Sequence, residues 1–157
     1  MRKCFLTLFY SGLSPIAPGT IGSIIAGIIG IPIVRYNPET IFLLGFLIGL
    51  IAIPQINLYE KEVQEHDSKE IVIDELVGMW IAMGIGGVLN NGFLMVILSF
   101  IFFRVYDITK PSIIGRIDKN VSGGLGVIGD DAIAGILAGI STLIVLKIYT
   151  LLHLPLF

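Results

Sequence analysis

The sequence Gly123-Gly-Leu-Gly-Val-Ile-Gly-Asp-Asp-Ala-Ile-Ala-Gly135 places two adjacent carboxylates, Asp130 and Asp131, directly before a long apolar run. The run covers residues 132–152 and is long enough to cross a bilayer, which takes about 20 residues of helix. We therefore expect a glycine-rich turn at 123–129 and a membrane-spanning helix after it. Ionised groups at the beginning of a membrane-spanning helix cost free energy, so they indicate a functional site unless they only cap the helix.

A second acidic pair has the same arrangement. Asp74 and Glu75, within Ile73-Asp-Glu-Leu-Val-Gly78, also open an apolar run. Between the two pairs lies a third polar cluster, Arg104-Val-Tyr-Asp-Ile-Thr-Lys-Pro111. A carboxylate in the first turn of a helix is favoured by the helix dipole, so capping remains the alternative interpretation of each pair. Its repetition favours a shared function.

Composition indicates an integral membrane protein with one domain, residues 1–157. Hydrophobic residues make up 55% of the chain and charged residues 14%, whereas a soluble domain has roughly 25% charged residues. The mean hydropathy is +0.93. A net charge of −2 argues against a nucleic-acid partner. The single cysteine, Cys4, excludes an internal disulfide and a cysteine-based metal site.

The apolar runs predict an all-α, polytopic membrane bundle of about five spans. Four runs precede the last one, at 21–34, 40–54, 71–85 and 93–103. A helix of about 15 residues covers only ~23 Å of a ~30 Å hydrocarbon core, so either the flanks extend these runs or one is re-entrant. The polar segments 55–70 and 104–129 are expected outside the membrane, the first as a solvated helix or loop and the second as a loop.

The distribution of lysine and arginine predicts a cytoplasmic N-terminus, because cytoplasmic segments are enriched in these residues. With five spans, only Arg35 and Lys147 fall outside. The inner segments hold Arg2, Lys3, Lys61, Lys69, Arg104, Lys110, Arg116 and Lys119. This orientation places the segment 14–23, both acidic pairs and the 104–111 cluster on one membrane face.

Carboxylates converging on one surface would repel one another unless a cation lies between them. Oxygen ligands favour Mg²⁺, with Mn²⁺ as the other possibility. Asp74, Glu75, Asp130 and Asp131 are the candidate metal ligands, with Asp107 and Asp118 on the same surface. Arg104 and Lys110 are candidates for binding substrate phosphate, and Arg116 and Lys119 add positive charge nearby. The implied reaction is metal-assisted phosphoryl chemistry at a membrane surface.

Several other classes of protein do not fit. A cysteine phosphatase needs an arginine six residues after Cys4, where Tyr10 stands, and no two aspartates form the D-x-D pattern of aspartyl-phosphate enzymes. The two histidines, His66 and His153, are predicted on opposite membrane faces. The Asp-Gly…Ala-Arg…Asp signature of lipid alcohol transferases is missing. A small ion or proton transporter remains the alternative, although it would need carboxylates near the middle of a span rather than at the span ends.

Four motifs occur together and in order: Ser14-Pro-x-Ala-Pro-Gly-Thr-x-Gly-Ser23, Ile71-Val-Ile-Asp-Glu-x-x-Gly78, Phe103-Arg-x-x-Asp-Ile-x-Lys-Pro111 and Gly123-Gly-x-Gly-Val…Asp130-Asp131-x-x-Ala-Gly135. Over nearly the whole chain this resembles the phosphatidylglycerophosphatase A family. Asp67 fits its polar lead-in, whereas Ser112 stands where an aromatic is common.

The resemblance implies a magnesium-dependent, multi-pass enzyme of the bacterial inner membrane. Such an enzyme removes the terminal phosphate of phosphatidylglycerophosphate, leaving phosphatidylglycerol. The catalytic set would then be Asp74, Glu75, Asp107, Asp130 and Asp131, and the 14–23 motif would add Thr20 and Ser23 to the phosphate-binding residues. The partners would be the phospholipid substrate and the bilayer.

Overall fold

The computed structural model describes residues 1–64, 68–89 and 92–152. His66, Asp67, the predicted turn at Asn90-Asn91 and His153 lie outside the described residues. Within the described ranges the chain is all-helical, without a β-strand, which confirms the all-α part of the predicted fold class. Its elements are α1 (Arg2–Leu6), η1 (Ser11–Leu13), α2 (Pro18–Tyr36), α3 (Pro38–Val63), α4 (Ile73–Gly86), α5 (Phe93–Thr109), α6 (Ile113–Asn120) and α7 (Gly124–Leu151).

The short helix α4 is the centre of the bundle. It packs against α2, α3, α5 and α7, and nearly every residue from Ile73 to Gly86 is buried. A helix that is apolar on all sides belongs in such a position, because it has no face to offer to water. The acidic pair Asp74 and Glu75 lies in its first turn. The surrounding helices therefore enclose one end of α4 together with these two acids.

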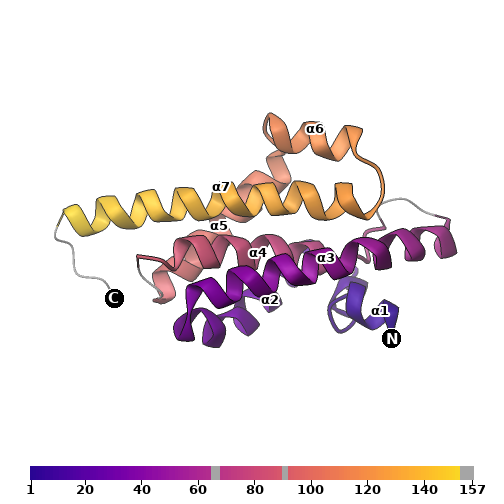
Figure 1. Ribbon diagram of the computed structural model, residues 1–157, viewed down its shortest axis with the longest axis horizontal. Helices are drawn as coiled ribbons and strands as arrows, with labels where there is room; N and C mark the ends of the chain where they lie inside the picture. Colours follow the sequence, from indigo (N-terminus) through magenta and orange to yellow (C-terminus); the bar gives the residue numbers. More distant parts are fainter. Residues whose placement is uncertain (65–67, 90–91, 153–157) are drawn as a thin grey trace.

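Among the residues that the structure describes, three helices are long and apolar enough to cross a bilayer, namely α2, α3 and α7. The helices α4 and α5 have 14 and 17 residues. The long helices lie along the long axis of the molecule, and α1 and α6 both lie toward the end where α3 ends and α7 begins (Figure 1). We call this the site end. The three membrane-length helices extend from the site end along the rest of the molecule (Figure 1).

Two predicted boundaries change. The helix α3 continues through Pro54 to Val63, so the polar residues after Pro54 extend a long helix. The prediction of a loop over 104–129 is wrong for most of its length, because α5 continues to Thr109, α6 occupies Ile113–Asn120 and α7 begins at Gly124. Pro18 begins α2, the position that proline tolerates best, so Thr20 and Ser23 are helical.

The predicted glycine-rich turn at 123–129 is also wrong beyond Gly123. Gly123 is the N-cap, with a φ of 74°, and the glycines after it are helical. Glycine is poor in a helix interior by about 1 kcal/mol, but packing decides here. A Cβ on Gly124 would overlap the Ile53 carbonyl oxygen, and one on Gly126 would overlap that of Val121. The glycines thus let α7 approach its neighbours closely.

Candidate active site

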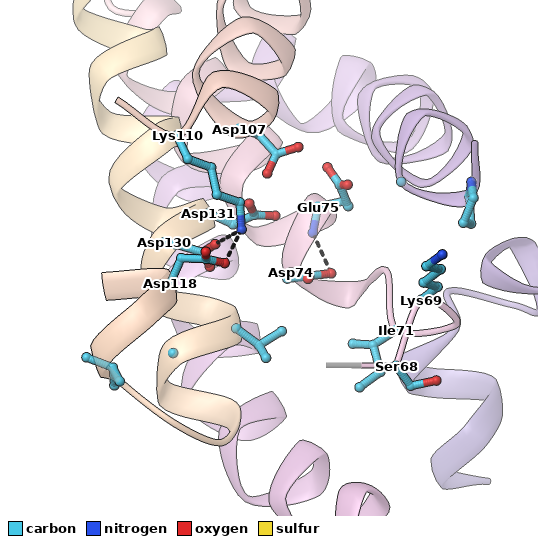
Figure 2. Close-up of a pocket in the computed structure, with 15 residues that line it drawn as sticks. Ser68, Lys69, Ile71, Asp74, Glu75, Asp107, Lys110, Asp118, Asp130 and Asp131 are labelled. Atoms are coloured by element: carbon cyan, nitrogen blue, oxygen red, sulfur yellow. Dashed lines mark hydrogen bonds and ion pairs between the residues drawn. The ribbon is translucent and has the colours of Figure 1, made fainter. Parts of the chain in front are cut away.

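The predicted acids lie around one cavity of about 230 Å³ at the site end. We call this cavity the acid pocket. Figure 2 shows its labelled side chains, with Lys110 and four aspartates on one side and Ser68 and Lys69 on the other. The charged residues of its lining are Lys69, Asp74, Glu75, Asp107, Lys110, Asp118, Asp130 and Asp131. All five predicted catalytic acids therefore share one cavity.

Helix α7 contributes Asp130 and Asp131 from its second turn rather than from its beginning. Because Gly123 is the N-cap of α7, neither aspartate caps the helix, and capping is wrong for this pair. Asp130 is 5% exposed and Asp131 is 3% exposed. The described residues place no hydrogen-bond donor or ion-pair partner on the Asp131 carboxylate. Asp131 is therefore a buried acid that lines the pocket, and no positively charged group among the described residues forms an ion pair with it.

Two glycines set how closely α7 approaches α4. A Cβ on Gly135 would overlap the carbonyl oxygen of Gly78, and a Cβ on Gly78 would lie 2.7 Å from the carbonyl oxygen of Asp131. Both are closer than real Cβ atoms come to other atoms. The backbones thus touch about one helical turn beyond the acids, which fixes the spacing between the two acidic pairs.

Lys110 links α7 to α6. Its ammonium Nζ donates to Asp130 Oδ2 at 2.7 Å and to Asp118 Oδ1. Lys110 ends α5 in a left-handed conformation with a φ of 41°, which turns the chain toward α6. Partial burial lowers the pKa of the Lys110 ammonium, but the hydrogen bonds to Asp118 and Asp130 outweigh burial and raise this pKa above its usual value. Lys110 is therefore charged at neutral pH.

The α4 acids have different surroundings. Asp74 Oδ1 accepts the backbone N–H of Glu75 at 3.0 Å, and Val72 rather than either acid is the N-cap. The Glu75 carboxylate is buried, and its Oε2 accepts from Ser23 Oγ at 2.8 Å and from Arg104 Nη1 at 2.5 Å. Arg104 Nη1 also lies 2.8 Å from Asp107 Oδ2. One guanidinium therefore holds two of the acids in place.

Three predicted phosphate-binding residues do not line the pocket: Thr20, Ser23 and Arg104. Ser23 is fully buried, and both Ser23 and Arg104 contact Glu75 from behind the cavity. Thr20 lies on α2 between Gly19, which does line the pocket, and Ser23. Of the predicted phosphate-binding residues, only Lys110 reaches the pocket directly.

Sequence reasoning missed other contributors. Lys69 and Ser68 line the pocket, and their only signal was their position just before the Ile71–Gly78 motif. Asp118 was grouped with the surface acids, but its contact with Lys110 depends on the unpredicted helix α6. Asn57 accepts the N–H of Gly124 at 2.7 Å through its Oδ1 and so supports the start of α7. That contact joins residues from distant parts of the chain, which no local pattern indicates.

The donor set of the pocket suits a hard divalent cation, although the described residues contain no group of three side chains already converged as a metal site. The pocket acids supply only oxygen ligands, the kind that Mg²⁺ prefers. Asp131 is buried within range of repulsion from Asp74, Glu75, Asp107 and Asp130. A cation among these carboxylates would offset that repulsion.

Comparison with known proteins identifies the family of the chain. The family model described as phosphatidylglycerophosphatase A matches residues 4–146. The chain belongs to the phosphatidylglycerophosphatase A family. It is 38% identical to the phosphatidylglycerophosphatase A of Escherichia coli over 134 residues, which covers 83% of this chain and 74% of that protein. The phosphatidylglycerophosphatase A of Haemophilus influenzae is 33% identical over 83% of this chain and 79% of its own length.

A third relative is described as a phosphatase of a different phospholipid. A protein of Bacteroides thetaiotaomicron described as a putative phosphatidylinositol-3-phosphatase is 37% identical over 83% of this chain and 84% of its own length. No solved structure matches the chain significantly. Membership of the phosphatidylglycerophosphatase A family makes this chain a phosphatase. The names of its relatives point to two different phospholipid headgroups, phosphatidylglycerophosphate and phosphatidylinositol 3-phosphate.

Proposed function

We propose that this enzyme hydrolyses the terminal phosphate monoester of phosphatidylglycerophosphate, giving phosphatidylglycerol and inorganic phosphate with Mg²⁺ as cofactor. The observation that carries the proposal is the acid pocket itself, where six acids, Lys69 and Lys110 meet at one end of membrane-length helices. Two phosphatidylglycerophosphatases among the relatives support this substrate.

Each group in the pocket has a proposed role. Asp74, Glu75, Asp130 and Asp131 would hold Mg²⁺, which when bound neutralises phosphate charge and favours attack by water. Lys110 binds a phosphate oxygen by a charge-assisted hydrogen bond. Asp107 accepts a proton from the attacking water, whose oxygen forms a bond to phosphorus as the bond to the lipid oxygen breaks. The lipid oxygen leaves with the electron pair of that bond and takes up the proton from Asp107, which gives the hydroxyl group of phosphatidylglycerol. Arg104 and Ser23 position Glu75 rather than touching substrate, which revises the role that we expected for them.

We also propose that α2, α3, α4, α5 and α7 form five membrane crossings, with the N-terminus and the site end at the cytoplasmic face of the bacterial inner membrane. The helix order supports this, because consecutive long helices alternate in direction and bring α1, α6 and the pocket to the same end (Figure 1). The excess of lysine and arginine in the segments at this end supports the orientation.

The experiment is phosphate release by the purified enzyme from phosphatidylglycerophosphate and from phosphatidylinositol 3-phosphate, each with and without Mg²⁺ or Mn²⁺. We expect release from phosphatidylglycerophosphate that depends on the metal. Faster release from phosphatidylinositol 3-phosphate would assign the substrate of the Bacteroides relative's name instead, and equal rates after chelation of metal would overturn the role of magnesium.

A further inference from the structure

A second cavity lies one helical turn beyond the acid pocket, between α2 and α5 and over α4. It has a volume of about 180 Å³, and we call it the acyl groove. The residues that matter here are Ile24, Gly27 and Ile28 of α2, Met79 of α4, and Ile97 and Phe100 of α5. Apart from Ser23 at its end, the lining is wholly apolar.

The acyl groove and the acid pocket are built on the same three helices. Gly19, Glu75 and Asp107 line the acid pocket, and the groove continues from Ser23 and Met79, four residues further along α2 and α4. On α5, which runs in the opposite direction, the groove begins at Phe100. The contact of Ser23 and Arg104 with Glu75 marks the boundary between the polar and the apolar cavity.

The groove is open on its outer side and buried on its floor. Ile24, Ile28 and Ile97 at the rim are 45%, 62% and 39% exposed, whereas Met79 on the floor is 1% exposed. Gly27 provides the depth, because an added Cβ would reach the Met79 Cε at 3.4 Å. From Ser23 to Ile31 the groove follows α2 for about 12 Å, given a rise of about 1.5 Å per residue.

We propose that the acyl groove holds one fatty-acyl chain of the phospholipid whose terminal phosphate occupies the acid pocket. The inference rests on the proposed function, which makes the substrate a lipid. Its headgroup matches the charged cavity, and the apolar cavity continues from it along the membrane-spanning helix α2. A chain seated there fixes the depth and orientation of the phosphate relative to the acids, and misplacement by about 1 Å can cost ~100-fold in rate.

A larger apolar cavity provides the matched control. It has a volume of about 390 Å³ and lies beside α1, lined by Ile29 of α2 and by Ile73, Leu76 and Trp80 of α4. None of these four residues lines either the acid pocket or the acyl groove. A larger side chain at Ile29 adds volume to the same helix, α2, but enters the control cavity and not the acyl groove.

The test compares Gly27→Leu and Ile97→Trp with the control Ile29→Trp. Each purified protein is given long-chain and four-carbon-chain phosphatidylglycerophosphate at the same mole fraction in detergent micelles. We expect both groove variants to lower the ratio of the long-chain to the short-chain kcat/KM by about tenfold, which corresponds to about 1.4 kcal/mol. The control keeps the wild-type ratio. Ile97→Trp carries the test if Gly27→Leu does not fold, because the Ile97 side chain is partly exposed.

Several outcomes would overturn the proposal that the acyl groove holds an acyl chain. An unchanged ratio in active groove variants would do so, as would an equal fall in the Ile29→Trp control. A change of oligomeric state in the groove variants, measured by light scattering, with the ratio unchanged would show that the groove is instead an interface between two copies. Failure of the proposed function looks different, because the wild type would then release no phosphate from either lipid.

Discussion

Asp131 is the acid whose negative charge the described residues balance least. Asp130 has Lys110, and Glu75 has Arg104 and Ser23, whereas Asp131 is buried among other carboxylates. Removing its charge should relieve repulsion in the metal-free protein and weaken metal binding at the same time. Stability and activity would then change in opposite directions, which a merely structural acid would not produce.

We therefore predict that Asp131→Asn lowers Mg²⁺-dependent phosphate release by at least about a hundredfold, since even indirect metal partners cost 10–100-fold when lost. The variant should unfold at a higher temperature than the wild type in EDTA. It should also lose the stabilisation by Mg²⁺, which is worth about 2.7 kcal/mol at 100 times the Kd. Thermal unfolding with and without Mg²⁺ measures both. A wild-type Mg²⁺ shift in Asp131→Asn would show that this acid is not a ligand.

Lys110 is the only predicted phosphate-binding residue that lines the acid pocket. Lys110→Ala should raise KM or lower kcat by about ten- to a hundredfold, the range of one hydrogen bond to a charged group. Lys119→Ala on the neighbouring helix removes the same charge from an exposed position and should leave both constants near wild type. If the two substitutions had equal effects, Lys110 would contribute only general positive charge and would not bind the phosphate directly.

The ionisation of Lys110 also has a consequence for pH. Its pKa is raised above 10.5 in the folded protein, so its ion pairs contribute fully below the unfolded pKa and are lost only as pH rises through the higher folded value. We predict that Lys110→Arg keeps the shape of the wild-type pH–rate profile between about pH 6 and 9. A profile that loses a limb in this variant would mean that Lys110 titrates during turnover.

At the scale of helices, the lengths of the apolar runs were enough to predict an all-α chain and to place both acidic pairs near the beginnings of helices. They were not enough to place Asp130 and Asp131 in the second turn of α7. Glycine propensity favours a turn at 124–129, whereas these glycines are helical and two of them lie too close to Ile53 and Val121 for any other residue. The roles of Ser23 and Arg104 depend on contacts across 52 and 29 residues with Glu75. Spacing in the sequence does not determine such contacts.

The crossing of α4 and α7 gives a prediction for the two glycines. Gly135→Ala should destabilise the protein by about 1–3 kcal/mol, the cost of overpacking, and lower activity by separating the two acidic pairs. Gly129→Ala on the same helix meets only the Ile117 side chain, at 3.4 Å, and should stabilise α7 by about 0.5–1 kcal/mol. Denaturation in detergent together with phosphate release measures both. If Gly135→Ala retained wild-type activity, the crossing would not control the spacing of the acids.

For the whole molecule, the proposed five-crossing arrangement predicts which surfaces face each side of the membrane. In a variant in which Cys4 is replaced by serine, Lys119→Cys on α6 and Tyr36→Cys at the far end of α2 should react with an impermeant maleimide from opposite sides. Both positions are exposed. Labelling of intact cells should modify position 36, and position 119 should need permeabilised cells. Labelling of both from the same side would contradict the proposed topology.

With the proposed topology, the position of Asp131 in α7 also predicts how the enzyme responds to the membrane potential. The residues from Ala132 to Leu151 span about 30 Å, the thickness of the hydrocarbon core. If they fill that core, the acids lie outside the electric field. A charge moved halfway through the field would change in energy by about 1.2 kcal/mol at 100 mV, roughly sevenfold in rate. We predict that a potassium diffusion potential across proteoliposomes leaves phosphate release unchanged. The protein would then work equally well on an energised and a depolarised membrane.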